Sequence, residues 1–257
     1  MSKEVMKMLT EERFDVIREL LTGDSIVKIQ AIVEATQASE STVRRDLSQL
    51  EELGELVRVH GGAKRQFSLE SEPSVPEKNL RFHDEKQSIG QYAAQLIQDN
   101  EFIYLDAGTT TLAMVPHIKA KGLTIVTNSL DLAGHLSEAS LNVIVLGGYL
   151  KNRTRAMIGS DAQKQLKQYR FSRAFMGTNG IDTKFGFTTP DSEEAHVKQT
   201  AAQQANRVYV LADASKFDKV SFCQFMELDE AIVITSPLGD RLGDKYHGVL
   251  EIKEVDR

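Results

Sequence analysis

Two groups of polar side chains in this sequence have types and spacings suited to binding chemistry. In residues 39–48, a serine that can cap a helix is followed by further hydroxyl side chains and by two adjacent arginines. Arginine can bridge O6 and N7 of guanine, and hydroxyls suit phosphates or base edges. In DAGTTT, residues 106–111, glycine lets the backbone approach an anion that threonine hydroxyls can bind. The first group indicates DNA binding and the second indicates phosphate binding.

The first group is expected to lie on one short helix. Ser39 has the chemistry of an N-cap, and Val43, Leu47 and Leu50 recur at the spacing of a buried helical stripe. With that stripe turned inward, the hydroxyl and guanidinium groups lie on the opposite side and its flanks. Side chains in the first turns of such a helix usually reach the bases. The residues expected to contact DNA from this helix are Ser41, Thr42, Arg44 and Arg45.

Two further helices are expected to hold this one in place. Thr10 is predicted to cap the first, which Gly23 ends, and the second is predicted over residues 28–36. Gly54 is predicted to end the third helix. Two helices joined by a short turn, with the second carrying the arginines, form a helix-turn-helix.

A basic hairpin follows the third helix. Residues 56–60 alternate as in a strand, and Gly61 with the next glycine permits a tight turn. Arg58 and His60 are expected to contact the DNA backbone or the minor groove. The sequence therefore predicts a winged helix-turn-helix over residues 1–63.

The charge distribution limits how this domain binds DNA. The net charge is −6, and residues 1–66 hold 10 Lys and Arg against 12 Asp and Glu. Residues 56–66, however, contain three basic side chains and no acidic ones. Local patches form the phosphate footprint, and the overall acidity predicts weak non-specific binding. The alternative is that the two helix arginines only face solvent and pair with Asp46 or Glu40.

The rest of the chain has a different pattern. Residues 64–80 are polar and interrupted by Ser and Pro, which predicts a linker. Residues 81–257 then alternate short apolar segments with helical ones, which predicts an α/β domain with a parallel sheet. The expected strands are 102–106, 123–128, 142–148, 173–182, 207–215 and, closing the sheet, 230–236.

Polar residues at the ends of these strands extend the phosphate-binding group. Ligands of parallel α/β sheets bind at the carboxyl ends of the strands. DAGTTT is expected to open a helix over 110–118, with Asp106 orienting the loop or binding a sugar hydroxyl. The alternatives are a plain strand-to-helix turn and, for Lys198, an ion pair with Glu194 four residues earlier. The candidate residues are Asp106, Gly108, Thr109, Thr110, Thr111, Asn128, Gly148, Asn179, Asp182, Lys198 and Lys216.

Other classes of protein lack their sequence signatures here. The single cysteine cannot form an internal disulfide, and the six histidines are scattered without ligand spacing, so no metal site is expected. Neither a GxxxxGK[ST] nor a GxGxxG motif is present, and we expect no cofactor. No apolar run is long enough for a signal core or a membrane span, so a cytoplasmic protein without membrane partners is expected.

The chain resembles the DeoR-type family of bacterial repressors. STVRRDLSQLEELGELVRVHGGA, residues 41–63, matches the family in its helix and wing. DAGTTT, TNS, LGG, GTNGID, GFTTPDSEEAHVK and LADASKF follow in the order of the family's sensor half, and the resemblance covers about residues 9–236. It implies a Rossmann-like, ribose-phosphate-isomerase-like sensor domain that binds a phosphorylated sugar and then releases DNA. The pattern is nearest to repressors of fructose and other phosphotransferase sugar operons.

The expected function is therefore transcriptional repression without catalysis. The chain would repress a sugar-utilisation operon by binding double-stranded operator DNA as a homo-oligomer, either a dimer or a tetramer. A sugar phosphate, with fructose 1-phosphate as the candidate, would release it. One alternative is a sugar-phosphate isomerase with an accessory DNA-binding domain, using Asp182, Glu193 and Lys198. The other is a DNA-binding module whose C-terminal domain only assembles oligomers.

Overall fold

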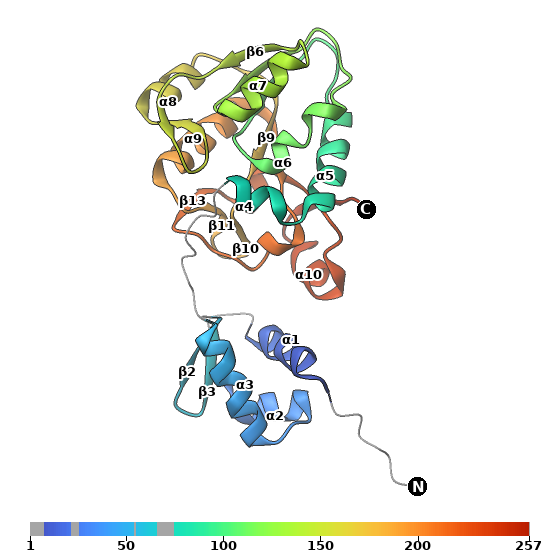
Figure 1. Ribbon diagram of the computed structural model, residues 1–257, viewed down its shortest axis with the longest axis vertical. Helices are drawn as coiled ribbons and strands as arrows, with labels where there is room; N and C mark the ends of the chain where they lie inside the picture. Colours follow the sequence, from blue (N-terminus) through green and yellow to red (C-terminus); the bar gives the residue numbers. More distant parts are fainter. Residues whose placement is uncertain (1–7, 22–25, 54, 66–74, 257) are drawn as a thin grey trace. The chain divides into compact units, whose positions relative to one another are not determined.

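The chain forms two compact units, residues 1–69 and 70–257. A computed structural model describes residues 8–21, 26–53, 55–65 and 75–256. In Figure 1 the N-terminal unit is blue and the C-terminal unit runs from teal to red. The division falls inside the expected linker, but both ends of that linker carry secondary structure. Strand β3 continues to Arg65, past the expected boundary at residue 63, and helix α4 spans Val75–Leu80.

The described part of the N-terminal unit is a winged helix-turn-helix. Its helices are α1 (Thr10–Leu20), α2 (Ile29–Thr36) and α3 (Glu40–Glu52). A small sheet has the order β1-β3-β2, with bounds Val27–Lys28, Gly62–Arg65 and Leu56–Val59. The apolar stripes of the helices meet in one core with the wing, as the spacing predicts. Its buried members are Phe14, Ile17, Leu21, Ile29, Ile32, Val43, Leu47, Leu50, Leu56 and Ala63.

The start of α1 differs from the sequence-based expectation. Thr10 is the first helical residue and not the cap. The N–H of Leu9, one residue earlier, donates instead to the Glu12 carboxylate over 2.7 Å. The Glu12 carboxylate therefore satisfies an amide at the helix start, while the Thr10 hydroxyl accepts the Arg13 guanidinium over 3.2 Å. Gly23 and Gly54, predicted to end helices, lie outside the described residues.

A parallel sheet of seven strands forms the centre of the C-terminal unit. The strand order is β15-β14-β12-β9-β4-β5-β6, and every neighbouring pair is parallel. The strands are, in chain order, β4 (Phe102–Leu105), β5 (Thr124–Thr127), β6 (Asn142–Val145), β9 (Phe171–Gly177), β12 (Ala205–Leu211), β14 (Ile232–Thr235) and β15 (Glu251–Glu254). The expectation that residues 230–236 close the sheet is wrong, because β15 pairs with β14. Its sequence EIKE has the charged residues typical of an edge strand and lacks an apolar run.

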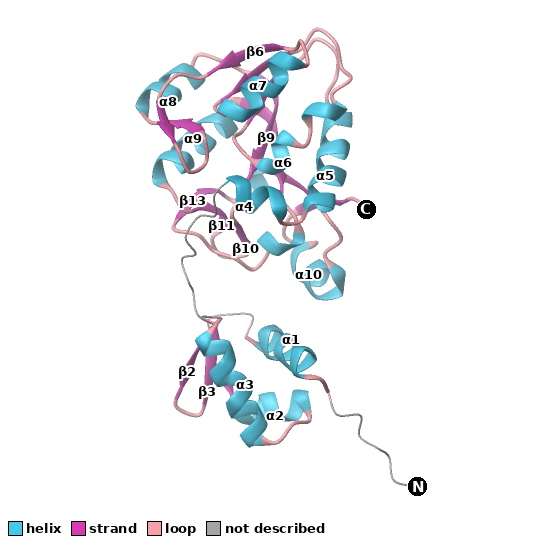
Figure 2. Ribbon diagram, in the orientation of Figure 1, coloured by secondary structure: helices cyan, strands magenta, loops and turns pink. Residues whose placement is uncertain are grey.

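Helices cover both faces of this sheet, as Figure 2 shows. Helices α5 (His83–Gln95) and α7 (Leu130–Glu138) pack on one face, and α8 (Ser160–Leu166), α9 (Ser192–Gln203) and α10 (Gly239–Tyr246) pack on the other. Side-chain alternation along β9 separates the two cores: Ala174 and Met176 belong to one and Phe175 to the other. Burial of both faces explains why the sheet strands are nearly continuous apolar runs.

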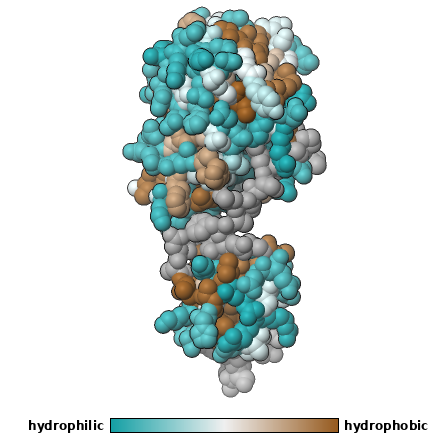
Figure 3. All heavy atoms as spheres, turned by 90° about the vertical axis from the view of Figure 1, so that its left-hand side faces the viewer, coloured by the Kyte–Doolittle hydropathy of each residue, from teal (hydrophilic) through white to brown (hydrophobic). Residues whose placement is uncertain are grey.

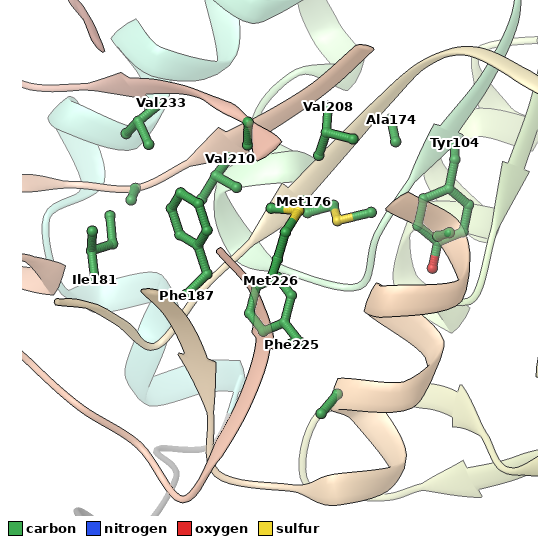
Figure 4. Packing of buried hydrophobic residues seen from close by; sticks show 14 of the residues in the cluster. Tyr104, Ala174, Met176, Ile181, Phe187, Val208, Val210, Phe225, Met226 and Val233 are labelled. Carbon is green, nitrogen blue, oxygen red and sulfur yellow. The ribbon is translucent and has the colours of Figure 1, made fainter. Parts of the chain in front are cut away.

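Two smaller antiparallel sheets were not expected from the sequence. One has the order β10-β11-β13, with bounds Gly180–Asp182, Gly186–Thr189 and Cys223–Met226. The other pairs β7 (Tyr149–Lys151) with β8 (Ala156–Ile158). The expected strand 173–182 is therefore two strands, since the chain leaves the main sheet after Gly177. Figure 4 shows Phe187 and Phe225 of the first small sheet beside Met176 of the main sheet.

The segment after DAGTTT is more broken than the expected helix over 110–118. It consists of α6 (Thr109–Leu112) followed by a 3-10 turn, η1 (Val115–His117). Helix α5 packs against this segment at Gly90, where a Cβ atom would lie 2.6 Å from the carbonyl carbon of Ala113. Only glycine permits this close approach. The packing of α5 thus fixes the position of the DAGTTT turn.

The surface of the C-terminal unit is mixed. Hydrophilic side chains cover most of the face in Figure 3, and hydrophobic ones gather in smaller groups between them. Among the described residues, no helix is both long and apolar enough to cross a membrane.

Candidate DNA interface and effector site

Hydroxyl groups gather at the start of α3. The Ser39 hydroxyl accepts the N–H of Thr42 over 3.2 Å, which is the expected N-cap. The hydroxyls of Ser41 and Thr42 each lie 2.9 Å from the Ser39 hydroxyl. Ser41 is exposed and Thr42 is half-buried. The helix therefore presents hydroxyls together with the positive end of its dipole, an arrangement that suits phosphate.

The two adjacent arginines of α3 have different surroundings. Arg44 pairs with Glu40, at 2.5 Å and 3.0 Å from the carboxylate oxygen. Arg45 is exposed and makes no hydrogen bond or ion pair to any described residue. Asp46 pairs with neither, because it is buried and held by Arg13 of α1 at 2.7 Å and 3.0 Å. Arg45 therefore breaks no described ion pair when it binds DNA, whereas Arg44 would have to leave Glu40.

The wing folds one of its candidate residues back toward α3. The guanidinium of Arg58 donates to the Ser48 hydroxyl over 2.5 Å, and its main-chain N–H donates to the Glu51 carboxylate over 2.9 Å. His60 is exposed at the hairpin turn, next to Gly61 with φ of +81°. The guanidinium of Arg58 would have to leave Ser48 to bind a phosphate oxygen, whereas the exposed His60 side chain is already accessible.

The second candidate site lies where the strand order of the main sheet reverses. From β4 the chain proceeds to β5 and β6 on one side, and β9, β12, β14 and β15 then lie on the other. The switch point is therefore between β4 and β9, whose carboxyl ends carry DAGTTT and GTNGID. Crevices at such points are where open α/β sheets bind ligands.

A buried ion pair joins the ends of these two strands. The Asp106 carboxylate accepts the N–H of Gly177 over 3.2 Å and also accepts the ammonium of Lys198. Lys198 donates in addition to the Gly177 carbonyl over 3.0 Å. Asp106 is 1% exposed and Lys198 is 5% exposed. The pair therefore positions the two loops and leaves little of either charge accessible to a ligand.

The expected alternative partner of Lys198 is engaged elsewhere. Glu194 accepts the Thr154 hydroxyl and lies 3.2 Å from the ammonium of Lys151. Lys151 also lies 3.1 Å from Asp191, which caps α9. These contacts attach the β7–β8 hairpin to the start of α9. A helix ion pair between Glu194 and Lys198 is therefore not the arrangement in the structure.

Several candidates in the DAGTTT turn have structural contacts. The Thr111 hydroxyl is buried and donates to the carbonyls of Asp106 and Gly108, at 2.7 Å and 2.9 Å. The Asn128 amide is also buried: its oxygen accepts the N–H of Ala107 over 2.9 Å, and its nitrogen donates to the Met157 carbonyl over 3.3 Å. Both side chains hold the turn in shape. Gly108 and Thr109 are half-buried, and Thr110 is 8% exposed.

Asn179 and Gly148 lie on loops that follow strands of the main sheet. Asn179 is half-buried and accepts the Thr189 hydroxyl over 3.3 Å. Gly148 is exposed with φ of +148°, and a Cβ there would lie 2.6 Å from the Ile158 carbonyl oxygen. Only glycine at position 148 leaves room for the Ile158 carbonyl of the β7–β8 hairpin to lie so close to the main chain.

Asp182 and Lys216 have different surroundings. The Asp182 carboxylate accepts the N–H groups of Lys184 and Phe185, at 2.9 Å and 3.3 Å, in the turn between β10 and β11. Its contacts belong to that turn and not to the switch point. Lys216 is half-buried at the end of the 3-10 turn η2 (Ala214–Lys216), which follows β12 and is capped by Asp213.

One cation near these loops was missed from the sequence. Lys86 in α5 is 7% exposed, and burial lowers its pKa. Helix α5 contacts both α6 of the DAGTTT turn and β12, and the charges of Asp213 and Lys216, which follow β12, respectively raise and lower the pKa of Lys86. A sequence signal existed: Lys86 is three residues before Ile89 and shares the inward stripe of α5.

The geometry does not assemble the three groups suggested for an isomerase. Asp182 is held in its turn, Lys198 pairs with Asp106, and the half-buried Glu193 lies 3.8 Å from His196. General acid–base catalysis needs a base within hydrogen-bonding reach of substrate. Among the described residues, no cluster of His, Cys, Asp and Glu could hold a metal ion.

A winged helix-turn-helix joined to a parallel α/β domain with polar loops at its switch point defines a DNA-binding regulator with a sensor domain. Residues 13–68 match the family model described as the DeoR-like helix-turn-helix domain, and residues 81–236 match the DeoR C terminal sensor domain. The chain belongs to the DeoR family of transcriptional regulators. This confirms the resemblance found in the sequence and the interpretation as a regulator instead of an enzyme.

Similar proteins cover nearly the whole chain. The uncharacterized HTH-type transcriptional regulator FruR of Bacillus subtilis is 44% identical over 96% of this chain and 99% of that protein. The lactose phosphotransferase system repressor of Staphylococcus epidermidis is 36% identical over 89% of this chain and 92% of that one. Among solved structures, ribose 5-phosphate isomerase A of Methanocaldococcus jannaschii aligns over 52% of this chain and 54% of that one, with 15% identity and a TM-score of 0.40.

Proposed function

We propose that this regulator represses a sugar-utilisation operon and is released from its operator by a phosphorylated sugar. The observation that carries the proposal is the DAGTTT turn at the switch point of a domain that matches the family's sensor model. The phosphotransferase repressor among the relatives supports the sugar class. Fructose 1-phosphate is the first candidate effector, because the sequence pattern is nearest to repressors of fructose operons.

The proposed DNA contacts follow from the N-terminal unit. Ser41, Thr42 and Arg44 meet the backbone or base edges from α3, and Arg45 supplies the main cation of that helix. Arg58 and His60 contact phosphate or the minor groove from the wing. Since residues in the first turns of a recognition helix reach the bases, sequence preference would depend mainly on α3.

The proposed effector contacts divide into two kinds. Gly108, Thr109 and Thr110 offer N–H groups or hydroxyls to the phosphate, and Lys216 adds positive charge. Asn179 and Gly148 line the rim. The residues proposed to shape the site from behind are Asp106, Thr111, Asn128 and Lys198. Asp182 is left out, because its contacts lie in the β10–β11 turn.

Release would follow from a shift between two states of an oligomer. Dimeric helix-turn-helix proteins read half-sites about 34–36 Å apart on DNA, so a small change in the spacing of two recognition helices lowers specific affinity. An effector can shift this equilibrium only by its different affinities for the two states. Coupling of this kind typically changes affinity by roughly 5- to 150-fold.

The test is operator affinity measured by fluorescence anisotropy at fixed salt, because salt sets the affinity. DNA from upstream of the protein's own gene is titrated, with fructose 1-phosphate, other sugar phosphates and the unphosphorylated sugars as additions. Weaker binding with one phosphorylated sugar alone would support the proposal and identify the effector. Tight specific binding that no compound changes would favour the oligomer-assembly alternative.

A further inference from the structure

Lys86 is a buried cation whose hydrogen bonds go to the main chain. It lies in the first turns of α5, and its ammonium donates to the carbonyls of Lys78 and Arg81, the latter over 2.6 Å. An ammonium has three donors, and these carbonyls use two. Among the described residues the hydrogen-bond acceptors of this ammonium are neutral carbonyls, and burying a lysine charge with neutral acceptors is costly.

The charges around Lys86 lie at the proposed effector site. Burial lowers the pKa of Lys86, while Asp213 raises it and Lys216 lowers it. Asp213 is 1% exposed and already accepts the N–H and the hydroxyl of Ser215. Lys86 and Lys216 are therefore like charges near the carboxyl end of β12, and α5, which carries Lys86, contacts α6 of the DAGTTT turn. An anion that enters there would relieve the repulsion between the two ammonium groups.

The carbonyls that Lys86 holds belong to the segment nearest the linker. Helix α4 is the first described element after residues 66–74, and Arg81 directly follows it. Helix α4 also contacts α6, the short helix of the DAGTTT turn, and Figure 1 shows the two beside each other. The segment 75–81 is therefore attached both to Lys86 and to the proposed phosphate-binding turn.

We propose that Lys86 links the effector site to this segment: its ammonium binds the anionic group of the effector in place of one or both carbonyls. Occupancy of the site then changes how residues 75–81, through which the chain continues to the DNA-binding unit, are held. This inference rests on the proposed function. Effector binding would then be coupled to release from DNA, because the Lys86 ammonium contacts carbonyls in the effector-free state and the effector in the bound state.

The test compares Lys86→Met with Lys164→Met, the same change at a lysine whose side chain is 74% exposed on α8. The full-length proteins are titrated with fructose 1-phosphate by calorimetry, and operator release is followed by anisotropy. Hydrogen exchange of the amides in 75–82 is measured with and without the ligand. Lys86→Arg, which keeps the charge, is the conservative variant, and thermal unfolding confirms that each variant is folded.

Lys86→Met should bind operator but bind the sugar phosphate roughly tenfold to a hundredfold more weakly, as for the loss of one charged hydrogen bond. Ligand should alter exchange in 75–82 of the wild type and of Lys164→Met, but not of Lys86→Met. Lys86→Arg should retain part of the response. If Lys86→Met responds like Lys164→Met, the inference is wrong while the proposed function stands. If the wild type itself responds to no sugar phosphate, both are wrong.

Discussion

Lys198 and Asp106 form a buried ion pair across 92 residues of sequence, and the same ammonium also binds the Gly177 carbonyl. The pair therefore joins α9 to the ends of β4 and β9 at the switch point of the sheet. Because both charges are buried, each depends on the other for compensation. The geometry of the DAGTTT turn is thus tied to the far half of the sensor domain.

Removing one partner should destabilise the sensor domain. Lys198→Met leaves the Asp106 carboxylate buried without its cation, so the free energy of unfolding should fall by about 3–5 kcal/mol. Urea unfolding measures this. The double variant Asp106→Asn with Lys198→Met should be more stable than Lys198→Met alone, since no buried charge remains uncompensated. Equal stability of the single and double variants would show that the pair is not coupled.

Arg45→Ala should weaken specific operator binding without affecting the sensor. Arg45 has no partner among the described residues, so its loss removes DNA contacts and little else. A guanidinium that bridges a guanine contributes about 1–3 kcal/mol of discrimination, which anisotropy with operator and scrambled DNA can measure. Arg170→Ala, the same change at an exposed arginine of the C-terminal unit, is the control. If Arg45→Ala distinguishes operator from scrambled DNA as well as the wild type does, Arg45 does not contact a base.

Thr110→Ala and Lys216→Ala should separate release from DNA binding. Both residues are proposed to meet the effector phosphate, and neither belongs to the DNA-binding unit. Each variant should bind operator as the wild type does, yet need at least about tenfold more sugar phosphate for release. Thr183→Ala and Lys164→Ala, at exposed positions, are the matched controls. Normal release in both Thr110→Ala and Lys216→Ala would contradict the assignment of the pocket.

Asp218 should make stability depend on pH in the acid range. Burial acts to raise its pKa, but hydrogen bonds from Lys245, Arg241 and Tyr246 outweigh burial and hold the pKa below 3.8. A carboxyl with a depressed folded-state pKa stabilises the protein above its unfolded pKa, and that stabilisation is lost as pH falls through the folded value. Asn tolerates the left-handed conformation at this position, where φ is +58°. The stability deficit of Asp218→Asn should therefore be larger at pH 7 than at pH 3 in urea unfolding.

An equal deficit at both pH values would show that Asp218 is not titrating with a depressed pKa. Burial acts to raise the pKa of Asp191, but the N–H of Glu194 and the ammonium of Lys151 lower it overall; Asp191 remains in both proteins and contributes a common background. The comparison between variant and wild type therefore isolates Asp218.

The sequence predicts local features of this molecule well. The N-cap at Ser39, the buried stripe Val43, Leu47 and Leu50, and the alternating strand of the wing depend on neighbouring residues. The main-sheet strands through β14 are likewise visible as short apolar runs. These are features in which period and capping chemistry decide the structure.

Contacts between segments that are far apart in the chain could not be predicted from the sequence. The residues around Lys198 in the sequence do not show that it pairs with Asp106 and not with Glu194, four residues before it. Tertiary packing decides between these two partners. The inward hydroxyl of Thr111 depends on the backbone of its own turn, which residue types do not specify. The missed strand β15 lacks an apolar run, since an edge strand is only partly buried.

The most direct test of the account is the reciprocity between operator and effector. The affinity of the sugar phosphate is measured by calorimetry for the free protein and for its operator complex. If binding of the two ligands is coupled, the effector must bind the complex more weakly by the same factor by which it weakens operator binding. We predict such a matched factor of roughly 5- to 150-fold. Equal affinity of the sugar phosphate for the free and the DNA-bound protein would contradict the account.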